Sequence, residues 1–201
     1  MRTQNAQAAK QLEQAARREF LKAGYDKASL RAIALSCGMS THMIYSRYGS
    51  KEGLFDSLVK DTADDFMQLF KKLHTESGEP DRAEQSKQAT DTALDFIYEH
   101  FEDFKLIFCR SAGTKYEQYF DSLVEIEEAA LRNTIPFKNV SAGSRFFFHK
   151  KAAEGLNDLY EIVSRELPKK DALEFMEMEK KFRLAGWSAV LQGEHNAGKK
   201  K

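Results

Sequence analysis

The sequence predicts an all-α protein of about nine helices, and two observations carry this prediction. The first is composition: the 201 residues include only 3 proline and 11 glycine residues, and leucine outnumbers valine and isoleucine together. Sheet proteins rely on the breakers and β-branched residues that are scarce here. The second is spacing, because apolar residues recur three or four positions apart along most of the chain. The length suits ordinary small domains and excludes a large multidomain enzyme.

The N-terminal part predicts three helices joined by short turns. Apolar residues follow a helical spacing from Leu12 onward, and Gly24 is expected to end that helix. Ser29 is expected to cap a short second helix that ends at Gly38, and Ser40 to cap a third helix directly afterwards. So short a link makes the two helices cross steeply, which is typical of a helix-turn-helix motif.

The remainder predicts six more helices. Ser50 is expected to cap a long fourth helix, and the segment Glu76–Asp81 after it has a linker-like composition. The following helices are expected at 83–100, 101–111, 116–134, 144–167 and 169–192, with Pro136 and Pro168 at two of the breaks. We place the functional boundary at the start of the fourth helix, which is long enough to belong to both parts.

The charge distribution favours a nucleic-acid partner, although the net charge is zero. Residues 1–60 hold 10 basic side chains against 5 acidic ones, whereas residues 61–135 hold 8 against 17. A basic N-terminal part followed by an acidic segment is the asymmetry expected when only the N-terminal part binds a polyanion.

Several classes of protein and site are disfavoured. The chain begins without an apolar signal core and has no run long enough to span a bilayer, so we expect a cytoplasmic protein without a membrane partner. Cys37 and Cys109 are far apart and indicate reduced thiols. Because the sequence has no zinc, phosphate-loop or hydrolase motif, we expect no enzyme activity, no metal and no cofactor.

The segment Ser29–Leu54, SLRAIALSCGMSTHMIYSRYGSKEGL, resembles the DNA-binding domain of the TetR family of bacterial repressors. The positions that match the family pattern are Ile33-Ala34, Gly38, Ser40, Tyr45, Tyr48, Lys51-Glu52 and Leu54. The upstream segment Ala15–Ser29 matches in its alanine, phenylalanine and glycine spacing. Three mild departures are Ser29 for threonine, Cys37 for alanine and Met39 for valine.

The resemblance implies a helix-turn-helix DNA-binding domain over residues 1–50 and an effector-binding and dimerisation domain over residues 51–201. A third helix that starts at Thr41 presents its first side chains to the major groove, while Ile44 points into the core. Thr41 and His42 suit base edges, and Met43 suits a thymine methyl group. The residues expected to contact DNA are Ser29, Arg31, Ser40, Thr41, His42, Met43, Tyr45, Ser46, Arg47, Tyr48 and Lys51.

Lys51 is expected to bind a phosphate. A cation in the first turn of a helix opposes the helix dipole at a cost of about 0.3–1 kcal/mol, and a phosphate at that end would offset it. Tyr45, Arg47 and Tyr48 also suit phosphates, which fix orientation without reading sequence. A solvated surface lysine is the alternative for Lys51, and an ordinary cap and surface charge are the alternatives for Ser29 and Arg31.

Aromatic residues are concentrated in the second part. Residues 96–148 hold 12 of the 23 aromatic side chains, and in TetR-like proteins this region encloses a cavity for a small apolar or aromatic effector. Plain core packing is the alternative. The residues expected to line the cavity are Phe101, Phe104, Phe108, Tyr116, Tyr119, Phe120, Phe147 and His149.

The last two helices predict a homodimer. The final helix carries one apolar row at Phe175, Met178, Phe182, Ala185 and Ala189 and a second at Leu184, Trp187 and Leu191. Two rows on one helix suggest two partners, the helix's own subunit and a twin subunit. A two-fold dimer spaces its recognition helices about 34–36 Å apart, which fits a near-palindromic double-stranded DNA operator.

The predicted function is therefore a ligand-responsive, sequence-specific transcriptional regulator, a repressor that acts on the nucleoid in the cytoplasm. Two alternatives belong to other classes. One is a protein-interaction adaptor that uses the helix-turn-helix only as a scaffold, and the other is a helical enzyme that acts on an apolar substrate.

Overall fold

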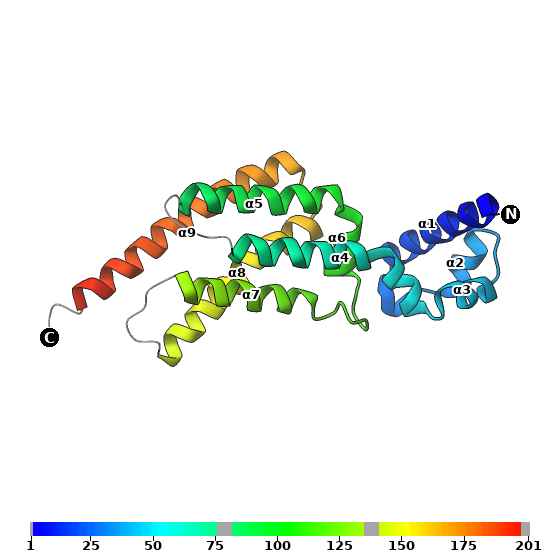
Figure 1. Cartoon of the computed structure of the whole chain (residues 1–201), viewed down its shortest axis with the longest axis horizontal. Helices are drawn as coiled ribbons and strands as arrows, with labels where there is room; N and C mark the ends of the chain where they lie inside the picture. The colour runs from blue at the N-terminus through cyan, green and yellow to red at the C-terminus, as the bar shows by residue number, and fades with distance from the viewer. Residues whose placement is uncertain (1, 76–81, 135–140, 198–201) are drawn as a thin grey trace. The chain divides into compact units, whose positions relative to one another are not determined.

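The structure is a computed structural model that describes residues 2–75, 82–134 and 141–197. Within these ranges the backbone forms nine α-helices and no β-strand (Figure 1), which confirms the predicted all-α fold. The helices are α1 (Arg2–Lys27), α2 (Leu30–Ser36), α3 (Thr41–Tyr48), α4 (Lys51–Thr75), α5 (Arg82–Glu99), α6 (Phe101–Cys109), α7 (Tyr119–Thr134), α8 (Ala142–Ser164) and α9 (Lys169–Ala197). None of the described helices has the length and apolar character that a membrane span requires.

The chain forms two compact units. Unit 1 consists of Met1–Gln68 and Glu99–Phe120, and unit 2 of Leu69–Tyr98 and Asp121–Lys201. The division falls inside α4, so this helix contributes to both units, as its predicted length suggested. The predicted functional boundary between residues 50 and 51 lies at the start of α4 and stays a prediction.

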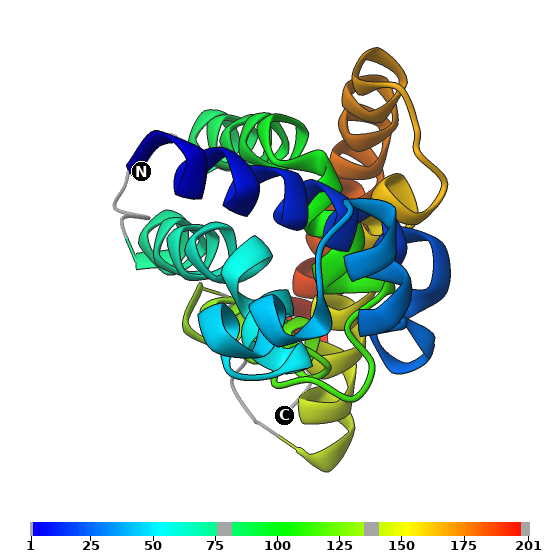
Figure 2. The ribbon, with the colours of Figure 1, turned by 90° about the vertical axis from the view of Figure 1, so that its right-hand side faces the viewer.

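The first three helices of unit 1 surround a small apolar core. Figures 1 and 2 show α2 and α3 beside α1, and Phe20, Ile33 and Ile44 are fully buried among them. The predicted inward orientation of Ile44 is confirmed. Phe55 of α4 completes this core with its ring centroid 5.1 Å from that of Phe20 in an edge-to-face arrangement.

Gly24 breaks the regular helix of α1, as the sequence predicted. Its φ of 77° and ψ of 160° are not helical, and the chain makes one further turn before α2. The amide of Tyr25 leaves the helical pattern and donates to the carbonyl of Arg110 at 2.9 Å. A side chain at residue 24 would be strained in this conformation, which favours glycine.

A half-buried carboxylate joins α6 to α1 and α4 within unit 1. The guanidinium of Arg17 donates to Asp103 Oδ1, and Thr62 Oγ1 donates to Asp103 Oδ2 at 2.7 Å. Only 13% of the Asp103 side chain is exposed. Because a desolvated carboxylate is costly without partners, these hydrogen bonds hold three helices in register.

Helix α7 begins at Tyr119 and not at Tyr116 as predicted. The amide of Tyr116 donates to Thr114 Oγ1 at 3.1 Å, which holds this stretch in a side-chain-closed turn. The Tyr116 hydroxyl donates to Asp56 of α4, and Lys115 Nζ lies 2.6 Å from the same carboxylate. Burial raises the pKa of Asp56, but these hydrogen bonds outweigh it and the net pKa is lowered.

The core of unit 2 contains the apolar row of α8. Ala152, Leu156, Leu159 and Val163 recur at helical spacing and are all buried. Two contacts join the end of α5 to the α8–α9 turn: Tyr98 donates its hydroxyl to the Leu167 carbonyl at 2.6 Å, and Lys169 pairs with Asp95 at 2.9 Å. Tyr98 and Leu167 are far apart in sequence, so this hydrogen bond joins two distant segments of unit 2.

The boundaries of the last two helices differ from the predicted ones. Helix α8 begins at Ala142 because Ser141 Oγ accepts a hydrogen bond from the Ser144 amide at 3.1 Å, which makes Ser141 its N-cap. Pro168 lies at the break before α9, as predicted, whereas Pro136 lies outside the described residues. Helix α9 continues to Ala197, beyond its predicted end at residue 192.

A histidine joins α4 to α7 in unit 2. The two ring nitrogens of His74 contact the Phe70 carbonyl and the Glu127 carboxylate. Burial alone lowers the pKa of His74, but the Glu127 carboxylate and the Phe70 carbonyl raise it above its ordinary value. The pair therefore favours the imidazolium and stabilises unit 2 most below the ordinary histidine pKa of about 6.5, with the contribution lost as the pH rises through the raised pKa.

Replacing Gly24 with alanine tests the importance of the break in α1. We expect Gly24→Ala to lower the free energy of unfolding by about 1–3 kcal/mol because alanine is strained at this positive φ. A Cβ at residue 24 would meet no neighbouring atom, so backbone strain is the whole cost. The control is Gly186→Ala in α9, where a Cβ also meets nothing. It should raise the free energy of unfolding by about 0.5–1 kcal/mol. Urea denaturation measures both, and a Gly24→Ala protein as stable as the parent would contradict the assignment.

Candidate nucleic-acid interface

A glycine-dependent corner separates α2 from α3. Gly38 has a φ of 67°, its amide donates to the Leu35 carbonyl at 3.2 Å, and the Met39 amide donates to the Ala34 carbonyl at 2.8 Å. These two hydrogen bonds form a Schellman motif, which ends a helix abruptly. The chain then takes an extended conformation at Ser40 and enters α3 at once. The predicted helix-turn-helix geometry is confirmed.

Serines occupy the three predicted N-cap positions, but only two of them use their side chains. Ser29 Oγ accepts from the Ala32 amide at 3.3 Å, and Ser50 Oγ accepts from the Gly53 amide at 2.9 Å. Ser40 has the extended backbone of an N-cap, yet its side chain makes no capping hydrogen bond, so the predicted side-chain cap is wrong there. The backbone conformation set by the corner suffices to start α3.

Helix α3 buries one side chain and exposes most of the others. Ile44 has no exposed surface, whereas Met43 is 43% and Tyr45 54% exposed. His42, Ser46 and Arg47 are also exposed, and Thr41 is half-buried. A helix held by one apolar anchor presents the rest of its surface to a partner. The predicted base-reading side chains have the exposure that this role requires, and their contact with DNA stays a prediction.

Tyr48 has partners within the protein. Its hydroxyl donates to Glu13 Oε1 of α1 at 3.0 Å, and its side chain is half-buried. Burial and the hydrogen bond to Glu13 raise the pKa of Tyr48 to about 12. The guanidinium of Arg47 lies 5.9 Å from the centroid of the Tyr48 ring. The sequence did not indicate the Glu13 contact, because it depends on the packing of α1 against α3.

Lys51 also has partners within the protein, at the N-terminus of α4. Its Nζ donates to the Asp26 carbonyl at 3.1 Å and lies 4.7 Å from the centroid of the Tyr25 ring. The carbonyl and the ring face compensate part of the cost of placing a cation at a helix N-terminus. The ammonium is thereby positioned beside the capped first turn of α4, and the half-buried side chain is not the freely solvated lysine that the alternative described.

The remaining predicted phosphate ligands lie at the start of α2. The Ser29 amide donates to Glu19 Oε1 at 3.2 Å, and the Ser29 side chain serves as the cap of α2. Arg31 is exposed in the first turn of the same helix. The ordinary-cap alternative therefore accounts for the Ser29 hydroxyl, while Arg31 stays accessible.

The predicted effector residues fall into the two units. Phe101, Phe104, Phe108, Tyr116, Tyr119 and Phe120 belong to unit 1, and Phe147 and His149 to unit 2. In unit 1, Phe104 is fully buried with its ring centroid 4.9 Å from that of Phe66 and 5.3 Å from that of Phe108. Such edge-to-face packing is typical of a filled core.

The tyrosines and the histidine of this group have partners of their own. The Tyr119 hydroxyl donates to the Ala63 carbonyl at 2.7 Å, and burial raises the pKa of both Tyr116 and Tyr119. In unit 2, Phe147 packs on Trp187 with centroids 5.4 Å apart, and the exposed His149 lies 3.0 Å from a Glu128 carboxylate oxygen. These contacts favour the core-packing alternative for the unit 1 group, and effector binding stays a prediction.

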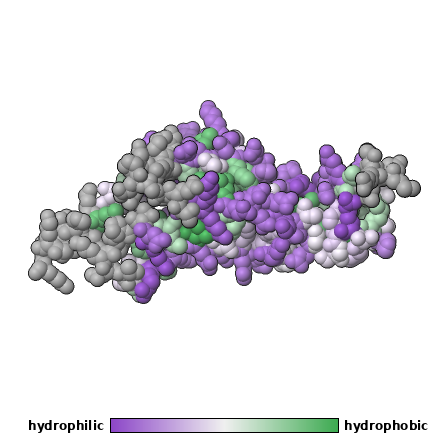
Figure 3. All heavy atoms as spheres, viewed as in Figure 1, coloured by the Kyte–Doolittle hydropathy of each residue, from purple (hydrophilic) through white to green (hydrophobic). Residues whose placement is uncertain are grey.

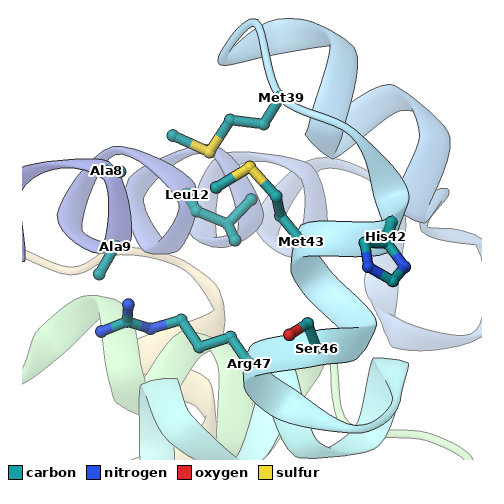
Figure 4. Close-up of a pocket in the computed structure, with 8 residues that line it drawn as sticks. All are labelled: Ala8, Ala9, Leu12, Met39, His42, Met43, Ser46 and Arg47. Carbon is teal, nitrogen blue, oxygen red and sulfur yellow. The ribbon is translucent and has the colours of Figure 1, made fainter. Parts of the chain in front are cut away.

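A hollow of about 330 Å³ lies between α1 and α3 (Figure 4). Its lining includes the predicted DNA contacts His42, Met43, Ser46 and Arg47. The other lining residues, Ala8, Ala9, Leu12 and Met39, did not enter the sequence-based site. The signal that was available is the Ala8-Ala9 pair, since two small side chains on α1 leave room beside a neighbouring helix.

Comparison with known proteins identifies the family to which this helix-turn-helix motif is similar. Residues 13–58 match the model of the bacterial regulatory proteins of the tetR family. The N-terminal domain of this chain is a TetR-family domain. The match covers the second half of α1, all of α2 and α3, and the start of α4.

Solved structures of TetR-like proteins have the same fold over most of the chain. A TetR-like transcriptional regulator from Rhodococcus sp. RHA1 superposes with a TM-score of 0.61 at 22% identity, over 89% of this chain and 96% of the other. NalD, the secondary repressor of the MexAB-OprM multidrug efflux pump in Pseudomonas aeruginosa, gives 0.58 at 16% identity, over 90% and 96%. A regulator of the TerR/AcrR family from Aquifex aeolicus gives 0.61 at 14% identity, over 87% and 98%. A search of curated proteins finds no significant match.

Tyr48→Phe tests the α1–α3 contact of this TetR-type domain. The substitution removes only the hydroxyl that donates to Glu13, so we expect the free energy of unfolding to fall by about 1 kcal/mol. Tyr45→Phe is the matched control in the same helix, and its exposed hydroxyl should leave stability unchanged. Chemical denaturation of both proteins measures the difference. If Tyr48→Phe and Tyr45→Phe have the same free energy of unfolding, the Tyr48–Glu13 hydrogen bond does not stabilise the packing of α3.

Proposed function

We propose that this protein is a ligand-responsive, sequence-specific DNA-binding transcriptional regulator, and that it acts as a repressor. The observation that carries the proposal is the exposed outer surface of α3, held by Ile44 and aimed by the corner at Gly38, within a TetR-type domain. A helix that follows so tight a turn and exposes its first turns suits the major groove. A regulator of this kind acts in the cytoplasm, on the chromosome.

The proposed contacts divide into base readers and phosphate ligands. Thr41, His42 and Met43 read base edges from the first turn of α3. The phosphate ligands are Ser29, Arg31, Ser40, Tyr45, Ser46, Arg47, Tyr48 and Lys51, and they fix the register of the domain on the duplex. Lys51 is already oriented by the Asp26 carbonyl and has further N–H donors, so it loses little side-chain freedom on binding, whereas the Tyr48 hydroxyl must leave Glu13 to donate to a phosphate.

The proposed homodimer uses the outer face of α9. Met178 is 57% and Phe182 73% exposed, and Ala185 and Ala189 are exposed beside them. The opposite face of the helix is occupied by its own unit, since Ala172 and Met176 are buried and Trp187 stacks on Phe148. An apolar row of this kind on a helix is expected to be covered by a partner, and a second α9 is self-complementary to it.

A small apolar or aromatic effector is proposed to release the repressor from its operator. NalD, which shares the fold, is a secondary repressor of an efflux pump, and this supports a repressor role here. Helix α4 is the element proposed to transmit the signal, since it is continuous from Lys51 at the DNA-binding end into unit 2. The effector must prefer the released state, because equal affinity for both states shifts nothing.

The function is tested by measuring operator and random-sequence DNA binding over a range of salt concentrations, with an operator chosen by selection from random duplexes. Lys51→Ala should weaken binding to both DNAs alike and reduce the salt slope by about one. Lys60→Ala, on an exposed part of the same helix where Lys60 pairs with Asp64, is the matched control and should change neither. His42→Ala should weaken operator binding by about 1–3 kcal/mol while random binding persists. A parent protein without salt-dependent DNA binding would refute the function.

Phe182→Glu tests the dimer. A carboxylate at the centre of the exposed α9 row should convert a dimer to a monomer in analytical ultracentrifugation and lower operator affinity at least tenfold, because a half-site alone remains. Leu35→Glu, at a leucine of α2 that is 79% exposed, is the control and should leave the mass unchanged. A Phe182→Glu protein that stays dimeric would move the interface away from α9.

A further inference from the structure

Two methionine side chains lie at the start of the exposed helix α3. Met39 belongs to the corner before the helix and Met43 to its first turn, and both line the hollow beside Leu12 of α1 (Figure 4). Met43 is 43% exposed, whereas Met39 is half-buried. Because Met43 is proposed to contact a thymine methyl group, the chemical state of its thioether bears directly on DNA binding.

The other methionines that the structure describes are less accessible in the proposed dimer. Met176 is only 6% exposed, and Met67 of α4 is half-buried. Met178 is 57% exposed, but it belongs to the apolar row of α9 that a second copy is proposed to cover. Since a dissolved oxidant must reach the sulfur atom, Met43 is the described methionine most open to oxidation when the protein is able to bind its operator.

We propose that Met43 is an oxidation site through which a small oxygen-transfer oxidant of the peroxide class releases this protein from its operator. The modification rests on the exposure of Met43 alone, whereas its effect on the operator rests on the proposed DNA-binding function. This mode of release is independent of the effector proposed for the aromatic residues. It also needs no movement of α4.

The reaction transfers one oxygen atom to the thioether. The Met43 sulfur attacks one oxygen of hydrogen peroxide, and the S–O bond forms as the O–O bond breaks. The departing hydroxide takes the proton of the transferred oxygen and leaves as water. The sulfur loses two electrons and the peroxide gains them, so hydrogen peroxide is the only co-reactant.

The product has the wrong chemistry for both surroundings of Met43. A sulfoxide oxygen accepts hydrogen bonds and donates none, whereas a thymine presents a methyl group and the O4 acceptor in the major groove. On the protein side, the side chains of Met39 and Leu12 offer no hydrogen-bond donor. Burying a polar oxygen without a donor is unfavourable, so the oxidised side chain favours water over the DNA contact.

The site is tested first in the absence of DNA. The full chain is treated with hydrogen peroxide, and sulfoxide formation at each methionine is followed by peptide mass spectrometry. Met43 should be oxidised about tenfold faster than the buried Met176 of the same chain. Equal rates of oxidation at Met43 and Met176 would overturn the proposal without bearing on DNA binding.

Operator binding then tests the consequence. Peroxide treatment should raise the operator Kd of the parent protein about tenfold. Met43→Leu has an apolar side chain of similar volume without sulfur, so its own operator Kd should be the same before and after treatment. Met178→Leu is the matched control and should respond to peroxide as the parent does. A Met43→Leu protein whose Kd rises as much as that of the parent would overturn the proposal.

Repair distinguishes the methionine from a cysteine. The half-buried Cys37 lies in the same corner, and its thiol donates to the Ile33 carbonyl at 3.3 Å. The two methionine sulfoxide reductases, one for each sulfoxide epimer, should together restore the operator Kd of the oxidised protein. Dithiothreitol alone reduces a sulfenic acid or a disulfide but leaves a sulfoxide intact. Recovery with dithiothreitol alone would therefore assign the loss to a cysteine and overturn the proposal.

Protection by the operator separates this proposal from the proposed function. Bound operator should slow the oxidation of Met43 and leave that of Met67 unchanged, because only Met43 is proposed to face the DNA. Oxidation of Met43 at the same rate in the free and the operator-bound protein would overturn the contact on which release depends. If Met43 is oxidised preferentially and the untreated protein binds no DNA, the failure belongs to the proposed function.

Discussion

The tight corner between α2 and α3 is the constraint on which the rest of the structure depends. Gly38 adopts a positive φ, the Schellman hydrogen bonds end α2, and α3 starts at Thr41, three residues after Gly38. Ile44 is the buried side chain that packs α3 against the core, and the Tyr48–Glu13 hydrogen bond adds a polar contact to α1. Every other position of α3 is then available for contact with a partner or with α1.

Polar contacts between distant parts of the sequence hold this arrangement together. Asp103 on α6 accepts hydrogen bonds from α1 and α4, and Tyr48 on α3 donates to Glu13 of α1. Asp103 and Tyr48 each have a hydrogen-bond partner, so the cost of taking these two groups out of water is offset. The apolar core packs these helices together, and the polar contacts fix how far each one slides along its neighbour. The apolar core and the polar contacts together set the orientation of the exposed surface of α3.

The sequence was most informative where the controlling interaction is local. Gly24, Gly38 and the caps at Ser29 and Ser50 are determined by a few neighbouring residues, and each could be predicted. Ser40 could not, because whether a serine hydroxyl bonds to its own helix depends on a small change of rotamer. The partners of Tyr48 and Lys51, and the α1 side of the hollow, depend on how α1 packs, which spacing alone does not reveal. The aromatic residues show the same limit, since composition cannot distinguish a lined cavity from a filled core.

The pairing of α8 with α9 explains why an apolar row on α9 stays outside its own unit. A Cβ at Gly155 would lie 2.6 Å from Nη1 of Arg183, so a side chain at this position would displace the guanidinium from α8. Burial raises the pKa of the neighbouring Asp158 to about 6, with Arg183 opposing the shift and Glu179 and Glu154 adding to it. The Oδ2 atom of Asp158 is buried without a hydrogen-bond partner among the described residues, so the attraction of Arg183 offsets only part of the cost of burying this carboxyl group. Trp187 packs on Phe147 and Phe148 of α8 from the opposite side of α9, and these contacts leave Phe182 on the outward face.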